Sequence, residues 1–351
     1  MSSYTTRLSN IEILRLVCIL LIVGAHVSGA YWKDLLFLER EIVLLYNSFS
    51  GMAVTLFVLI SGYFGITFKK SKFFTLVNIV WFYSVVLCLF KISITGFNSQ
   101  EILRSFFPVL SCKYWFATYY VILFVLSPFI NNLLGNLTKS QFRWLIIILA
   151  FFFVIAPTFI YFEILGDKGK GLPNMILAYC IGRYLAIYGF PRYFKLYPKR
   201  IFFACILGTF LLNSLITEWR GTMSLPFCRD NSLFILVQSV ACLCLFLRFN
   251  FVSAKINYLS LFVFPLYISS KSLQFLVDQK QYLVFDNTLL SVLCNFVAIV
   301  IVCVLLELIR RAVLGKGFKA VERKELSVVD GIIRHISVWK LKEYMSEIWS
   351  S

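Results

Sequence analysis

Three ionisable residues, Glu12, Arg15 and His26, lie in one otherwise apolar stretch near the start of the chain. Ionisable side chains inside an apolar segment are costly in lipid and mark candidate functional sites. In a helix, residues eleven positions apart lie on one face, roughly 16 Å apart along the axis, so Arg15 and His26 share a face. Glu12 precedes Arg15 by three residues, which is the spacing of a helical ion pair. The stretch therefore predicts a polar site on one helix face.

His26 is the member of this group whose chemistry suits catalysis. A neutral imidazole is the usual general base in proteins, and its task here would be to take a proton from a hydroxyl. The simpler alternative for His26 is a packed histidine that is hydrogen-bonded between helices. For Arg15 the alternative is a side chain that reaches the inner membrane surface, and for Glu12 it is a role only as the partner of Arg15.

The spacing of Arg15 and His26 suits a ligand with an anionic end and a reactive end deep in the protein. Coenzyme A has this shape, because its phosphates stand at one end and its thioester at the end of a long arm. Arg15 and the cluster Lys69, Lys70 and Lys72 would hold the phosphates. The alternative for the lysines is the ordinary positive charge that orients membrane proteins.

Composition indicates which elements carry these residues. Hydrophobic residues make up 60% of the 351 residues and charged residues 15%, and soluble proteins rarely expose the apolar surface that this would require. We therefore expect an all-α polytopic membrane protein with about ten transmembrane helices, each of about 20 mostly apolar residues. The predicted spans are Ile11–Ala30, Asn47–Thr67, Phe73–Gly96, Tyr114–Leu134, Phe142–Phe162, Leu172–Phe190, Ile201–Thr217, Asn231–Leu247, Ile256–Val277 and Leu289–Ile309.

Charge alternates between the loops that join these spans. One set of loops and their edges, from Arg7 and Lys69 to Arg248 and Lys255, holds twelve basic residues and no acidic residue. The other set holds nine basic residues that are offset by ten acidic ones. The positive-inside rule places the first set and both termini in the cytoplasm. It also accounts for the net charge of +17 without nucleic-acid binding.

The predicted organisation is a ten-helix transmembrane domain over residues 1–309 and a cytoplasmic tail over residues 310–351. Apolar residues at helical spacing in the tail predict an amphipathic helix on the inner membrane surface: Ile332, Ile336, Trp339 and Ile348. Two histidines in the whole chain, and no cysteine pair at zinc-ligand spacing, argue against a metal site.

Four stretches resemble one known family. Asn10-Ile-Glu-Ile-Leu-Arg15, followed after ten residues by His26, is similar to the start of the membrane acyltransferase 3 family, and in particular of its polysaccharide O-acetyltransferase-like members. Phe57–Phe64, which contains Ser61-Gly-Tyr63, resembles the second span of the family. Lys113-Tyr-Trp-Phe116 and Leu126-Ser-Pro-Phe-Ile-Asn131 resemble its fourth span. Lys69 and Lys72 stand where the family often carries a basic pair. The resemblance is close from about residue 10 to residue 190 and general beyond it.

The resemblance implies an acyl-CoA donor, often acetyl-CoA, and a carbohydrate hydroxyl as acceptor, in a bacterial plasma membrane. It implies His26 as the catalytic residue and Arg15 as its companion, to which we add Glu12. We expect Arg15, Lys69 and Lys72 to bind the coenzyme. The candidate acceptor-binding residues are Ser61, Tyr63, Tyr114, Trp115 and Tyr119. The last three are equally typical of an interfacial aromatic belt.

One position departs from the family pattern. Many relatives end a late span with Tyr-Leu-Ile-His, whereas this chain has Tyr267-Ile-Ser-Ser270. The leading hypothesis is an enzyme that moves an acyl group, expected to be acetyl, from acyl-CoA to a surface polysaccharide or its lipid-linked precursor. Direct transfer and a covalent acyl-His26 both remain open. The alternatives are a glycolipid transporter or flippase, and a non-catalytic component of polysaccharide assembly, which Ser270 keeps open.

Overall fold

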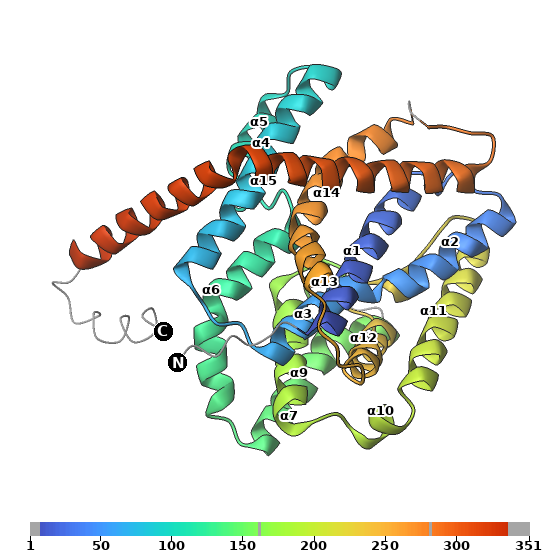
Figure 1. The fold of residues 1–351 in the computed structure, drawn as a ribbon. Helices are drawn as coiled ribbons and strands as arrows, with labels where there is room; N and C mark the ends of the chain where they lie inside the picture. The colour runs from blue at the N-terminus through green and yellow to red at the C-terminus, as the bar shows by residue number, and fades with distance from the viewer. Residues whose placement is uncertain (1–7, 161–162, 281–282, 336–351) are drawn as a thin grey trace.

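A computed structural model describes residues 8–160, 163–280 and 283–335, with side chains up to residue 330. Within these ranges the chain folds into helices and loops without a strand (Figure 1). Eight helical units are long and apolar enough to cross a membrane, which confirms the predicted all-α membrane fold. They are α1 (Ser9–Gly29), α2–α3 (Phe37–Ser50 and Met52–Phe64), α4 (Lys70–Thr95), α6 (Trp115–Gly135), α7–α8 (Lys139–Ala150 and Ala156–Phe159), α11 (Pro198–Arg220), α13–α14 (Ala254–Leu259 and Val263–Asp278) and α15 (Thr288–His335).

Two shorter helices occupy the sixth and eighth predicted spans. These are α9 (Leu172–Tyr188), with 17 residues, and α12 (Leu233–Phe246), with 14 residues. Short helices α5 (Ser99–Phe106) and α10 (Arg192–Leu196) lie in connections between the long ones. The exact number of crossings and the cytoplasmic side of both termini stay predictions.

The second span begins ten residues earlier than the sequence predicted, at Phe37 instead of Asn47. The prediction was wrong because it treated the charged residues before Asn47 as a loop. In the structure these charges contact α11: Arg40 pairs with Glu218, and Ser214 donates to Glu41 at 2.7 Å. Pairing across to α11 allows the helix to start before the apolar run.

The fifth span is interrupted near its end. A π-helical segment, Phe151–Ile155, separates α7 from α8, and Pro157 follows it. Proline has no N–H to donate and its ring crowds the preceding turn, so a regular α-helix is not maintained there. Thr158 partly compensates, because its hydroxyl donates to the carbonyl of Val154 at 2.6 Å.

Helix α1, which carries the predicted site, lies in the interior of the bundle (Figure 1). Within its most apolar window 61% of the residues are buried, compared with 22% for α7–α8 and for α15. It packs against α14, α3, α15 and α2. Its fully buried side chains include Leu14, Cys18 and Val27. The polar residues of α1 are therefore surrounded by protein instead of lipid, as intramembrane ionisable groups require.

Helices α3 and α9 cross in close contact through two glycines. A Cβ atom on Gly62 would lie 2.2 Å from the carbonyl oxygen of Tyr179, and one on Gly182 would lie 2.2 Å from that of Leu59. Only glycine permits backbones to approach so closely, which is a common device in membrane bundles. Gly62 of the Ser-Gly-Tyr stretch is thus explained by packing.

A polar clamp holds the turn that follows α3. Tyr179 donates from its hydroxyl to Asn131 at 2.7 Å and accepts from the N–H of Ile66 at 3.0 Å. Asn131 in turn donates to the carbonyl of Ile66 at 2.9 Å. Gly65, at φ +73°, makes the turn possible. Asn131 of the Ser-Pro-Phe-Ile-Asn stretch therefore has a structural role.

Helix α15 continues without a break through residue 309, where the sequence analysis separated the last span from the tail. Glu307, which is fully buried, anchors it to α4 by accepting from Tyr83 at 2.6 Å. The same carboxylate pairs with Arg310 at 2.7 Å and Arg311 at 2.6 Å. Further along, Asp330 pairs with Lys70 at 2.9 Å. Of the four predicted apolar tail residues, Ile336, Trp339 and Ile348 lie outside the described residues.

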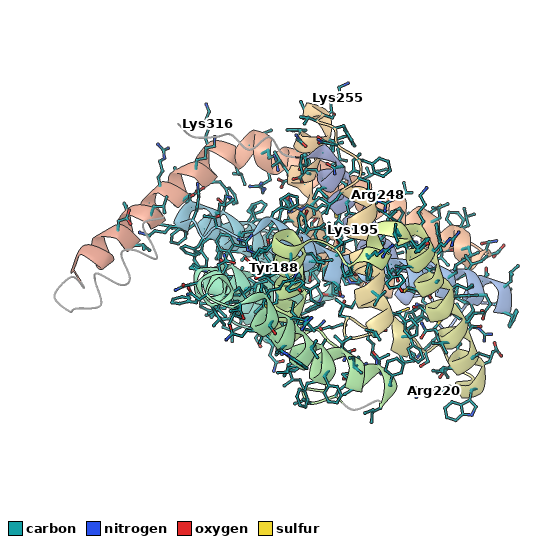
Figure 2. All side chains as sticks on the ribbon, turned by 90° about the horizontal axis from the view of Figure 1, so that it is seen from below. Tyr188, Lys195, Arg220, Arg248, Lys255 and Lys316 are labelled. Carbon is teal, nitrogen blue, oxygen red and sulfur yellow. The ribbon has the colours of Figure 1, made fainter. Side chains whose placement is uncertain are left out.

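Basic residues of the two predicted loop sets lie at opposite ends of α11. Lys195 precedes the start of this helix, and its carbonyl accepts a hydrogen bond from Arg248. Arg220 ends the helix and lies well away from that pair (Figure 2). If α11 crosses the membrane, the positive-inside rule predicts that these two groups of basic residues lie on opposite sides of it.

Candidate functional site

The inner part of α1 carries an ion pair. Arg15 lies 3.1 Å from Glu12, at the predicted i, i+3 spacing. The carboxylate side chain is 8% exposed and the guanidinium side chain 31% exposed. Arg15 thus keeps part of its donor surface accessible while Glu12 fixes its position, an arrangement suited to binding an oxyanion.

His26 lies three turns further along the same helix. Its backbone carbonyl is in the last turn of α1, where the helix no longer supplies a donor, because Ala30 donates to Val27. Gln274 of α14 supplies that donor at 3.0 Å, and also donates to Asp278 at 3.0 Å. Helix α14 therefore fixes the turn that carries His26.

His26 as a residue is only partly exposed, and its ring lies deep in the bundle. Its Nδ1 atom is buried and has no hydrogen-bond partner among the described residues. Nε2 is consequently the nitrogen that a substrate can reach. The positive charges of Lys271 and Lys170 act on the ring. An imidazole with nearby cations is suited to proton transfer next to a developing negative charge.

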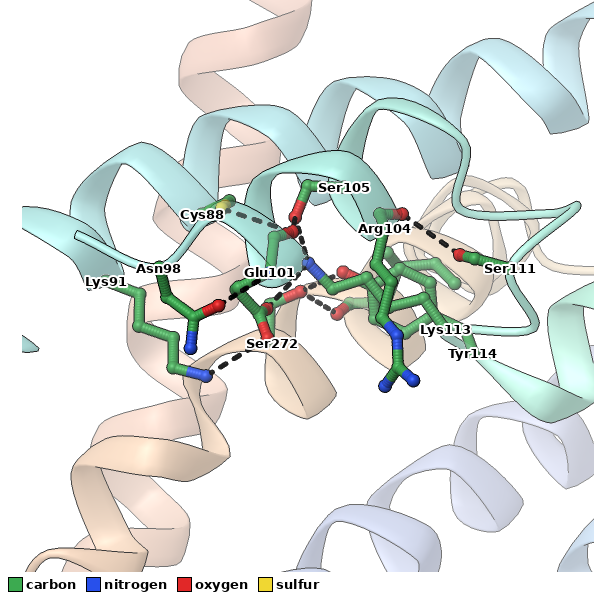
Figure 3. A network of polar contacts seen from close by, with 11 residues as sticks. Cys88, Lys91, Asn98, Glu101, Arg104, Ser105, Ser111, Lys113, Tyr114 and Ser272 are labelled. Atoms are coloured by element: carbon green, nitrogen blue, oxygen red, sulfur yellow. Dashed lines mark hydrogen bonds and ion pairs between the residues drawn. The ribbon is translucent and has the colours of Figure 1, made fainter.

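A cavity of about 300 Å³ lies beside this end of α1, between α4, α5 and α14. Gln274, which holds His26, lines it together with Ser272 and Tyr114. Its size is at the lower end of the roughly 300–1,000 Å³ typical of small-molecule sites. Six charged residues line it: Lys91, Glu101, Arg104, Lys113, Lys271 and Asp278. Most of them appear in Figure 3, where Lys91 and Lys113 both reach Glu101.

The predicted acceptor-binding aromatics at the start of α6 have different surroundings. Tyr114 shares a 2.6 Å hydrogen bond with Ser272 and lines the cavity. Trp115 presents its ring to Lys170, whose Nζ lies 5.8 Å from the ring centroid. Tyr119 is half-buried and packs against the core. Of the three, only Tyr114 lines the cavity.

The predicted acceptor residues of α3 do not line this cavity. Ser61 is hydrogen-bonded to the carbonyl of Phe57 at 2.9 Å and to the hydroxyl of Tyr120 at 3.2 Å. Tyr63 packs its ring against Phe190, with centroids 6.1 Å apart. Their role in acceptor binding stays a prediction.

The predicted phosphate-binding lysines flank the start of α4. Lys69 is the residue before its first turn and Lys72 lies within that turn, and both are exposed. Lys70, between them, is engaged by Asp330. The role of Lys69 and Lys72 in coenzyme binding also stays a prediction.

Asp230 is a functional candidate that sequence reasoning passed over as an ordinary loop acid. It lies in the connection before α12, where burial raises the pKa of its carboxyl from 3.8 to about 7. The nearby Lys170 opposes this rise and Asp167 adds to it. Lys170 also acts on His26, so Asp230 belongs to the same electrostatic surroundings. A buried carboxyl with a strongly raised pKa is a common feature of active sites.

Ser270 lies at the position where the sequence resemblance implies a histidine in many family members. It is buried, and its hydroxyl donates to the carbonyl of Tyr267 at 3.2 Å. Tyr267 meets the ring of Phe116 edge-on at 5.4 Å. Ser270 thus satisfies its hydrogen bond within α14 and supplies no proton-transfer group equivalent to the missing imidazole.

These features define a multi-pass membrane protein with a histidine on an interior helix, whose turn is held by a residue that lines a polar cavity. Comparison with protein families gives the same class: the model of an acyltransferase domain, that of the acyltransferase 3 family, matches residues 8–308. The chain therefore belongs to this family and is a membrane acyltransferase. No curated protein and no solved structure matches it.

Proposed function

We propose that the protein transfers an acetyl group from acetyl-CoA to a hydroxyl of a surface polysaccharide or its lipid-linked precursor in the bacterial plasma membrane. The observation that carries the proposal is the placement of His26. This partly exposed residue lies on an interior helix, and Gln274 ties this helix end to a polar cavity of about 300 Å³. Family membership supports transfer of an acyl group over transport of a glycolipid.

The two substrates approach from opposite ends of α1 in this proposal. Arg15, held by Glu12, takes an oxyanion of the coenzyme together with Lys69 and Lys72, and the thioester extends along α1. The acceptor sugar enters from the end near Tyr114. Because Arg15 and His26 are separated by roughly 16 Å along one helix, one side chain cannot perform both tasks.

His26 acts as the general base in the simplest chemistry. Its Nε2 takes the proton of the sugar hydroxyl, whose oxygen attacks the thioester carbonyl carbon. The carbon–sulfur bond then breaks, and the coenzyme thiolate takes the proton from the imidazolium. In the two-step alternative Nε2 itself attacks the thioester carbonyl carbon, the carbon–sulfur bond breaks and the coenzyme leaves as its thiolate. The sugar hydroxyl oxygen then attacks the acyl carbon of acyl-His26, the bond to Nε2 breaks, and the hydroxyl proton passes to the thiolate.

Proton NMR of surface polysaccharide tests the proposed function. Polysaccharide is compared from a host that carries the wild-type protein and from one that carries an empty vector. The proposal predicts an acetyl ester signal that mild alkali removes and that only the wild-type sample shows. A change in the amount of polysaccharide without any ester signal would favour transport or assembly instead.

A further inference from the structure

The cavity that Gln274 lines has an excess of positive charge, and His26 itself is not among its lining residues. Four of its lining residues are cationic, Lys91, Arg104, Lys113 and Lys271, and two are acidic, Glu101 and Asp278. A water-filled pocket lined mainly by one sign of charge concentrates ligands of the opposite sign.

Two of the four cations are already paired with a carboxylate. Glu101 lies 3.0 Å from Lys113 and 3.6 Å from Lys91, so one carboxylate serves both lysines. These two ion pairs hold the pKa of Glu101 below its usual value against the opposing effect of burial. Lys113 also donates to Ser105 at 2.5 Å. Lys91, Lys113 and Glu101 thus form a fixed wall of the cavity (Figure 3).

The other two cations are left free for a ligand. Arg104 and Lys271 form no ion pair with any residue that the structure describes. Asp278 is near enough to act on the charge of Lys271, but it is hydrogen-bonded to Gln274 instead. In Figure 3 the guanidinium of Arg104 extends away from the Glu101 network. An arginine and a lysine that face one cavity are suited to an oxyanion, which arginine binds through two parallel hydrogen bonds.

The free cations are also linked to the candidate base. Lys271 is three residues before Gln274 on α14, and Gln274 binds the carbonyl of His26. Lys271 acts on the ring of His26 as well. A ligand anion at Lys271 therefore lies next to the turn that carries His26.

A second cavity of about 230 Å³ adjoins the first and shares Lys91 and Glu101 with it. The loop Gly96–Asn98, between α4 and α5, forms much of its lining. Two cavities that meet at one ion pair provide room for an acceptor longer than a single sugar ring.

We propose that the cavity between α4, α5 and α14 selects an acidic acceptor, a sugar that carries a carboxylate or phosphate substituent, through Arg104 and Lys271. This inference rests on the proposed function for the identity of the acceptor as a glycan. The sugar oxyanion binds the two free cations, which places the sugar next to Gln274, the residue that holds the turn of His26.

Cys112 offers a direct readout, because it is exposed and lines the cavity. The purified full-length protein is treated with a maleimide, and the labelling rate of Cys112 is measured with a Cys112→Ser protein as the background. Methyl β-D-glucuronide, glucose 6-phosphate and the neutral methyl β-D-glucoside are compared as protecting ligands. Binding of the same sugars is measured in parallel by calorimetry.

The inference predicts protection by the glucuronide, the sugar phosphate or both, and none by the glucoside at equal concentration. Which anion protects identifies the substituent. The double substitution Arg104→Gln with Lys271→Gln should weaken protection and calorimetric affinity about tenfold or more. Arg104→Lys with Lys271→Arg should retain most of both. Arg220→Gln, a basic residue remote from the cavity, should change neither.

Equal binding of the neutral and acidic sugars would overturn the inference, as would the absence of binding in both assays. So would protection that persists in the double Gln protein, provided that it remains folded by its melting temperature. No acyl-CoA is present in these assays. If no acidic sugar binds but the polysaccharide NMR shows the acetyl ester, only the acidic acceptor is rejected. If an acidic sugar binds but the NMR shows no ester, only acyl transfer is rejected.

Discussion

Gln274 donates a 3.0 Å hydrogen bond to the backbone carbonyl of His26, across 248 positions of sequence. This bond replaces the donor that α1 lacks at its last turn, and it couples the position of His26 to α14. Orientation of a reacting group is worth several orders of magnitude in rate, so small displacements of His26 should be costly.

Two substitutions of Gln274 should each lower kcat about 10- to 100-fold. Gln274→Leu removes the amide group, and Gln274→Glu keeps the shape of the side chain but removes its N–H donor. The KM for acyl-CoA should stay unchanged, because the proposed site for the coenzyme phosphates is at the other end of α1. Steady-state kinetics of the purified protein measure both constants. Gln279→Leu, at an exposed position just after α14, is the matched control. A wild-type kcat in Gln274→Leu would show that the bond does not orient His26.

The glycine crossing of α3 and α9 predicts a strong effect on stability. Gly62→Ala and Gly182→Ala each place a methyl group against a backbone carbonyl, and overpacking of this kind costs about 1–3 kcal/mol. Thermal unfolding in detergent should show a lower Tm for both proteins. Gly135→Ala, where an added Cβ meets nothing within 4 Å, should leave Tm unchanged or higher. Equal melting of all three variants would contradict the close crossing.

Two acidic residues of α15 should differ sharply in their contribution to stability. Glu307→Gln leaves Arg310 and Arg311 without their buried carboxylate and should destabilise by about 3–5 kcal/mol. Asp330→Asn removes a more exposed pair with Lys70 and should cost less than about 1 kcal/mol. Melting temperatures of the two variants provide the comparison. The anchor role assigned to Glu307 fails if Asp330→Asn is the more damaging change.

The raised pKa of Asp230 predicts a pH dependence of stability. The folded protein keeps this carboxyl protonated up to about pH 7, whereas the unfolded chain releases the proton near its ordinary pKa of 3.8. The folded state binds more protons between these values, so stability falls as pH rises through this window and then levels off. Asp230→Asn should flatten this fall and melt higher than wild type at pH 8.

The control for this pH series is Asp286→Asn, at an exposed loop position. It should keep the wild-type slope of Tm against pH between about pH 4 and pH 7. Parallel slopes in Asp230→Asn and wild type would mean that Asp230 titrates like an ordinary exposed carboxyl.

Local patterns in the sequence were sufficient for part of this description. The pairing of Glu12 with Arg15 follows from their spacing, and the apolar runs located the long helices. The contact of Gln274 with His26 could not be predicted in this way, because it depends on how α14 docks against α1. Asp230 resembled any loop carboxylate, since its burial arises from the segments around Lys170 and Asp167.

The early start of the second span is another feature that the sequence alone could not predict. Glu41 looked like part of a loop because the partner that satisfies it, Ser214, lies far along the chain. Hydropathy alone excludes such charges from a helix, and only the packed structure reveals their partners.

The proposed role of His26 in acyl transfer can be tested with labelled substrate. Membranes with wild-type, His26→Ala or His335→Ala protein at equal level are incubated with labelled acetyl-CoA and polysaccharide from the host. Alkali-labile label on the glycan is then counted. We expect label with wild type and with His335→Ala, and a loss of at least about 100-fold with His26→Ala. Equal labelling by His26→Ala and wild type would contradict it.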